Sequence, residues 1–123
     1  MVKLRDKSGG SMAETVLSKR RGELKEKLRQ KALSRLKAAA AMLYTEGAES
    51  VFVFGSVLRP LEFNEHSDVD IAVSGIAEDK RGIVITSLET IFRGMQFDIM
   101  FLEDDLRPEI SERIKREGML WNH

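Results

Sequence analysis

Apolar residues recur every three or four positions from residue 23 to about residue 46. This spacing places them on one face of a helix. Gly22 favours a break just before this stretch, and Gly47 is a typical residue at the end of a helix. Ser11-Met12-Ala13-Glu14 has the form of a capping box and could start an earlier helix, which Gly22 is expected to weaken or break. We therefore predict a long helix whose clearly helical part begins near Glu23. Its buried face is expected to contain Leu24, Leu28, Ala32, Leu36, Ala40 and Leu43.

Three short segments after Gly47 have the composition of strands. They cover residues 51–54, 68–73 and 96–102, and they are rich in β-branched and aromatic residues. Pro60 prevents a continuous strand between the first two segments. The last residues, 119–123, could add an edge strand.

Two further helices are expected. One covers residue 78 to about residue 93, and the other covers residue 108 to about residue 117, where Pro108 suits the first helical turn. The resulting order is helix, strand, strand, helix, strand, helix. It predicts an α/β (α+β) architecture with a small mixed sheet of three to four strands and helices packed against it. The core candidates of the second helix are Ile83, Ile85, Leu88, Ile91 and Phe92.

The length of 123 residues corresponds to one domain with a single modest core. The absence of cysteine excludes disulfides and a thiolate zinc site, and it is compatible with a reducing cytoplasm, where we expect the protein. No apolar run approaches the roughly 18 residues that cross a membrane, so no membrane contact is expected. Residues 8–11, SGGS, are typical of a linker or tag. We therefore treat residues 1–22 as a basic extension and residues 23–123 as the domain.

Charge is distributed unevenly along the chain. Residues 1–40 carry 12 lysines and arginines against 4 aspartates and glutamates, whereas residues 41–123 carry 8 against 16. A basic segment can contact nucleic acid or an acidic partner, but a solvated helix face gives the same pattern and is the commoner case. The segment has no aromatic residue for base stacking, so direct nucleic-acid binding is not expected, although its charge permits it.

The most informative residues lie between the first two predicted strands. Gly55 and Ser56 follow the first strand, and Asp68-Val69-Asp70 opens the second. Two carboxylates one residue apart on a strand point to the same side. Their oxygens suit Mg²⁺, and a Gly-Ser turn can offer N–H groups and a hydroxyl to phosphates. Each motif alone could be a plain turn or cap; the combination favours metal-assisted handling of a nucleoside triphosphate.

A third carboxylate, Asp98, interrupts the apolar segment FDIMF of the third predicted strand. Its neighbours are expected to be buried, and an unpaired ionised carboxylate there would be costly. A metal ion shared with Asp68 and Asp70 would remove that cost, and three carboxylates on one sheet face can hold two Mg²⁺ ions roughly 3.5–4 Å apart. The alternative is a salt-bridged or edge-strand aspartate.

The motifs GS…SDVDIAV and FDIMFLED resemble those of the nucleotidyltransferases of the DNA polymerase β superfamily, specifically the minimal nucleotidyltransferases (MNT). The resemblance runs from about Leu24 to Trp121. Relatives commonly have ten residues between G-S and D-x-D, whereas eleven stand here, and Pro60 takes the place of a common glycine. The resemblance implies the polymerase β-like nucleotidyltransferase fold.

The resemblance also implies roles for individual residues. Gly55, Ser56 and Arg59 would bind the triphosphate of the substrate ATP. Asp68, Asp70 and Asp98 would bind two Mg²⁺ ions and carry out catalysis, and Asp98 would also help to activate the acceptor hydroxyl. For Arg59, an exposed loop position without function remains the alternative.

Many minimal nucleotidyltransferases are antitoxins of a HEPN-domain ribonuclease toxin, and they move AMP from ATP onto a tyrosine of that toxin. The resemblance therefore implies a HEPN partner and a protein adenylyltransferase activity. Two alternatives stay open: neutralisation by binding alone with a degenerate site, and transfer to a small-molecule alcohol. The chain has little room for an acceptor-binding domain, which favours an acceptor delivered by a partner protein.

Overall fold

The computed structural model describes residues 12–104 and 107–122, and the linker-like residues 8–11 lie outside this part. Three single turns of 3-10 helix, η1 (Ser56–Leu58), η2 (Glu78–Lys80) and η3 (Leu102–Asp104), connect the main elements. No helix in the described part is long and apolar enough to span a membrane. The main elements are α1 (Met12–Thr45), β1 (Ser50–Phe54), β2 (Val69–Ser74), α2 (Arg81–Ile91), β3 (Phe97–Phe101), α3 (Pro108–Glu117) and β4 (Met119–Leu120).

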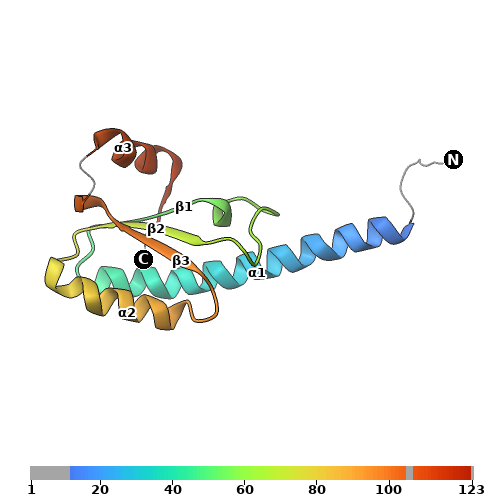
Figure 1. The fold of residues 1–123 in the computed structure, drawn as a ribbon, viewed down its shortest axis with the longest axis horizontal. Coiled ribbons are helices and arrows are strands. Elements are labelled where there is room, and N and C mark those ends of the chain that lie inside the picture. The colour runs from blue at the N-terminus through green and yellow to red at the C-terminus, as the bar shows by residue number, and fades with distance from the viewer. Residues whose placement is uncertain (1–11, 105–106, 123) are drawn as a thin grey trace.

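The four strands form one mixed sheet in the order β3-β2-β1-β4. Strand β1 is antiparallel to β2 and to β4, whereas β2 and β3 are parallel and are connected through α2. Helices α1 and α2 cover one face of the sheet, and α3 lies over the other (Figure 1). The predicted α/β architecture, including the C-terminal edge strand, is confirmed.

The core lies between the sheet and the helices α1 and α2. Alternate residues of the strands point into it, and they meet the apolar face of α1 from Ala32 onward. Leu24, predicted on the same face, is 59% exposed, because α1 projects beyond the end of the sheet (Figure 1). The largest fully buried side chains include Leu36, Leu43, Val51, Val53, Phe63, Val69, Ile71, Val73, Val84, Leu88 and Phe92.

Two predictions about the helices are wrong. The first helix does not begin at Glu23 but runs unbroken through Gly22 for 34 residues. A glycine costs a helix only about 1 kcal/mol, and the strong helix formers on both sides offset this. In α2, the predicted core residues Ile83 and Ile85 are 62% and 37% exposed, whereas Val84 is fully buried. Val84 and Leu88 are one turn apart, so they share the face that meets the core.

Candidate active site

Two of the three predicted carboxylates are neighbours across the sheet. Asp70 on β2 and Asp98 on β3 are direct partners in the parallel register, and adjacent strands lie about 4.8 Å apart. Asp68 precedes β2 by one residue, so strand alternation places it on the same side as Asp70. Because Val69 and Ile71 are buried in the core, the aspartates belong to the opposite face of the sheet.

The Gly-Ser turn lies directly beside this face. Phe54, the last residue of β1, is the register partner of Asp70, and Gly55 follows it. The backbone of Gly55 has φ 89°, and a Cβ built there would stand 2.5 Å from Oδ2 of Asp70. Only glycine combines this backbone with so close an approach. The predicted nucleotide residue and the predicted metal ligand are therefore in contact.

The electrostatics of this cluster are unfavourable without a cation. Partial burial, reinforced by the negative charges of Asp68 and Asp98, raises the pKa of Asp70 from its ordinary 3.8 to about 6. Like charges on neighbouring carboxylates oppose ionisation in this way. Asp70 is the most enclosed of the three, since Asp68 and Asp98 are both exposed.

The exposure of Asp98 corrects one step of the sequence argument. Its strand neighbours Phe97 and Ile99 are only half-buried, and Asp98 itself faces solvent, because β3 is an edge strand of the sheet. The assignment of Asp98 to the site therefore does not follow from a burial cost. It follows from the strand register, which places Asp98 opposite Asp70. Within residues 12–104 and 107–122, no group of three or more His, Cys, Asp or Glu side chains is arranged to hold a metal ion.

The residues of the loop that follows Gly55 have different environments. Ser56 is half-buried and begins the turn η1, in which Leu58 N–H donates to the carbonyl of Gly55. Arg59 is exposed, and its Nε donates to Oε1 of Glu62 at 2.6 Å. Such exposed ion pairs contribute little, so Arg59 can leave Glu62 at low cost. Its predicted contact with a phosphate stays a prediction.

Sequence reasoning missed one residue at this loop. Nε of Arg29, on α1, donates to the carbonyl of Val57 at 2.8 Å. The two residues are 28 positions apart, and Arg29 is one of many basic residues along α1. No motif distinguishes it from the others, so only the packing of α1 against η1 identifies it.

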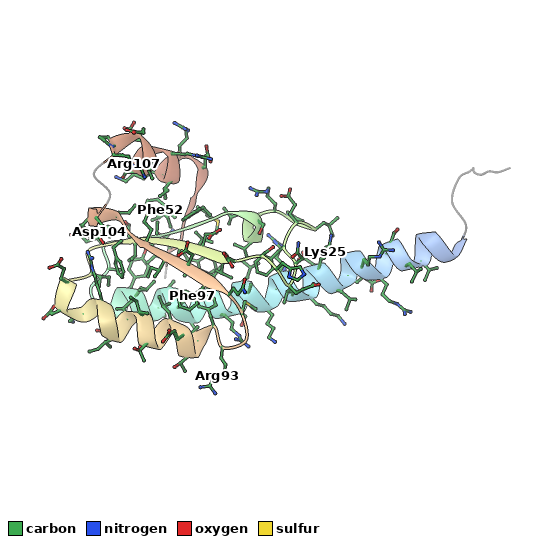
Figure 2. All side chains as sticks on the ribbon, viewed as in Figure 1. Lys25, Phe52, Arg93, Phe97, Asp104 and Arg107 are labelled. Carbon is green, nitrogen blue, oxygen red and sulfur yellow. The ribbon has the colours of Figure 1, made fainter. Side chains whose placement is uncertain are left out.

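The sheet face that carries the aspartates is partly covered by α3. Phe52 of β1 lies between the sheet and α3 (Figure 2), and together with Ser111 and Lys115 of α3 it lines a hollow on that face. A second hollow of about 400 Å³ lies beside Asp98, with Met100 and Ile110 among its apolar walls. Asp98 therefore borders open space into which an acceptor group can enter.

Comparisons with known proteins identify the family and a similar fold. The family model described as "Polymerase beta, Nucleotidyltransferase" matches residues 26–121. A solved structure described as a "putative minimal nucleotidyltransferase" is similar, with a TM-score of 0.62 and 29% sequence identity. The match covers 74% of this chain and 93% of that one. No curated protein matches the chain.

Proposed function

The chain belongs to the polymerase beta nucleotidyltransferase family, and on this premise we propose that it transfers AMP from ATP to a hydroxyl group with the help of divalent metal ions. The observation that carries the proposal is the contact between the Gly-Ser turn and the carboxylate cluster. Gly55 lies against Asp70, and Asp70 lies opposite Asp98. A triphosphate held at the turn would therefore have three carboxylates beside it.

The residues present fit Mg²⁺. Carboxylate oxygens are the ligands that this ion prefers, and a cation among Asp68, Asp70 and Asp98 would relieve the repulsion that raises the pKa of Asp70. The backbone register already brings the carboxylates together, and their side chains would have to turn toward one another to share an ion. A bound ion would supply charge neutralisation for the triphosphate and lower the pKa of the attacking hydroxyl.

The proposed reaction is a single displacement at phosphorus. The acceptor oxygen forms a bond to the α-phosphorus of ATP, and the bond from that phosphorus to the bridging oxygen of the β-phosphate breaks. Pyrophosphate leaves, and the hydroxyl proton passes to a carboxylate, which we assign to Asp98 because it borders the open hollow. Gly55 and Ser56 would orient the triphosphate, so the protein contributes chiefly position and charge.

The acceptor we propose is a tyrosine of a HEPN-domain toxin, which makes this protein an antitoxin. The motif resemblance to the minimal nucleotidyltransferases supports this assignment. A second support is the open hollow beside Asp98, through which a side chain of a partner protein can reach the carboxylates.

Labelled ATP, Mg²⁺ and the proposed HEPN-domain partner provide the test. Label on the α-phosphate should become covalently attached to the partner, and the Asp70→Asn variant should abolish the transfer. If neutralisation of the partner survives the double change Asp68→Ala and Asp70→Ala, the protein acts by binding alone. If label never reaches the partner from the wild-type protein, the proposed protein adenylylation is wrong.

A further inference from the structure

Helix α1 contacts the turn η1 at Val57, the only fully buried residue of that turn. Val57 is 0% exposed, and its carbonyl accepts the 2.8 Å hydrogen bond from Nε of Arg29. The Arg29 side chain is only 17% exposed. A hydrogen bond from a charged donor in such a site is stronger than one between neutral groups. The bond therefore fixes the distance between η1 and α1.

The guanidinium of Arg29 is itself held in place. Its Nη1 pairs with Oε2 of Glu26 at 3.2 Å, and Nε2 of Gln30 donates to the same Glu26 oxygen at 2.7 Å. Glu26 therefore restrains the arginine through a second nitrogen of the same guanidinium group. A guanidinium already held in this way loses little additional freedom when its Nε binds the carbonyl.

The loop makes a second approach to α1 further along. Leu61 has φ 68°, the one positive value outside glycine in the described residues, and its Cδ2 lies 3.5 Å from a Cβ built on Gly22. Beyond it, Phe63 is buried in the core, and Asn64 N–H donates to Oγ of Ser67 at 3.1 Å. The stretch between Gly55 and Asp68 is thus attached at several points, and Arg29 is the attachment nearest to the Gly-Ser turn.

We infer that Arg29 is a positioning residue for nucleotide binding: through the Val57 carbonyl it holds the Gly-Ser turn at the distance from Asp70 that a triphosphate requires. The inference rests on the proposed function. Two amides of the turn, those of Leu58 and Arg59, bond back to Gly55 and Ser56. A displacement of Val57 would therefore move the backbone that we expect to contact the phosphates.

The test compares two arginines of α1 that make the same kind of bond. Arg35 donates to the carbonyls of Ile91 and Arg93, so Arg35→Ala removes an arginine-to-carbonyl contact away from the Gly-Ser turn. The affinity of each variant for Mg·ATP and for AMP is measured by calorimetry. Arg29→Ala should weaken Mg·ATP binding about tenfold and AMP binding much less. Arg35→Ala should leave both affinities unchanged, and Arg29→Lys, which keeps a donor, should recover most of the loss.

Hydrogen exchange of the unliganded proteins supplies a second readout. The amides of Leu58 and Arg59 should exchange faster in Arg29→Ala than in Arg35→Ala. Equal affinities for Mg·ATP in the two alanine variants would overturn the inference. If the wild-type protein binds no Mg·ATP, the proposed function fails, and so does the part of the inference that concerns nucleotide binding. The part that concerns the turn is tested by exchange alone: unchanged exchange at Leu58 and Arg59 in Arg29→Ala would show that Arg29 does not hold the turn.

Discussion

The carboxylate of Asp70 lies against the Cα atom of Gly55, where a Cβ would stand 2.5 Å from Oδ2. Gly55→Ala should therefore displace either the turn or the carboxylate, and the positive φ of 89° adds strain. We expect a loss of roughly 1–3 kcal/mol in the free energy of unfolding, together with loss of nucleotide binding. Chemical denaturation and calorimetry measure the two effects.

A matched control for this change is Gly82→Ala. A Cβ on Gly82 meets no atom within 4 Å, and the residue lies in α2, where alanine is the better helix former. This variant should be as stable as the wild type or up to about 1 kcal/mol more stable. Equal stability of the two alanine variants would show that Gly55 tolerates a side chain.

Replacement of Asp70 should stabilise the metal-free protein while it removes function. The pKa of Asp70 is raised to about 6 in the folded state, so the folded state binds this proton more tightly than the unfolded state does. Stability from this group is fully present below pH 4 and is lost as the pH rises through 6. Asp70→Asn should therefore raise the free energy of unfolding at pH 7 by about 1 kcal/mol, a value reduced for partial solvent exposure.

The pH dependence distinguishes this effect from a general packing gain. The stability difference between Asp70→Asn and wild type, measured by denaturation in the presence of a chelator, should grow between pH 4 and pH 6 and then level off. A difference that stays constant across this range would mean that the charge of Asp70 is not its cause.

Mg²⁺ together with a non-hydrolysable ATP analogue should stabilise the folded protein. A ligand at ten times its dissociation constant adds about 1.4 kcal/mol when it binds only the folded state, which corresponds to a shift of several degrees in Tm. The analogue without Mg²⁺, or with Asp70→Asn, should give a much smaller shift. A shift that is independent of Mg²⁺ would contradict the assignment of the carboxylates as metal ligands.

Arg59 and Glu62 offer a test of the phosphate contact predicted from the motif. In the structure they pair with each other at 2.6 Å on the surface. If Arg59 contacts the triphosphate, Arg59→Ala should weaken Mg·ATP binding several-fold, whereas Glu62→Ala should leave the affinity unchanged or improve it, because it releases the arginine. Calorimetry measures the affinity of the two variants for Mg·ATP. Equal affinities would mean that Arg59 takes part only in the surface ion pair.

The sequence predicts the elements well because their signals are local. The apolar alternation of β2, the glycine that ends α1 (Gly47) and the proline that begins α3 (Pro108) are read directly from the chain. The predicted face of α2 is wrong because it takes Ile83 and Ile85 as core residues, whereas helical spacing from Leu88 and Phe92 leads to Val84, which is the buried residue. The predicted break at Gly22 is wrong, because one glycine costs only about 1 kcal/mol and the other residues of the 34-residue helix offset it.

The site was predictable only in part. The D-x-D spacing places Asp68 and Asp70 on one side of a strand by alternation alone. The position of Asp98 opposite Asp70 depends on the parallel register, which no local pattern determines. The burial that the apolar segment FDIMF predicts for Asp98 is wrong, because β3 is an edge strand and Asp98 is exposed. The bond from Arg29 to Val57 depends on tertiary packing alone.

The parallel pairing of β2 and β3 has a consequence for the biogenesis of the site. Asp70 and Asp98 can meet only after the intervening α2 has crossed the sheet, and β1 is flanked on its other side by β4, near the C-terminal end. Contacts between distant parts of a chain form late in folding. A partly synthesised or partly folded chain would therefore contain every residue of the site and still lack its geometry, so the proposed reaction with ATP would report on completion of the whole domain.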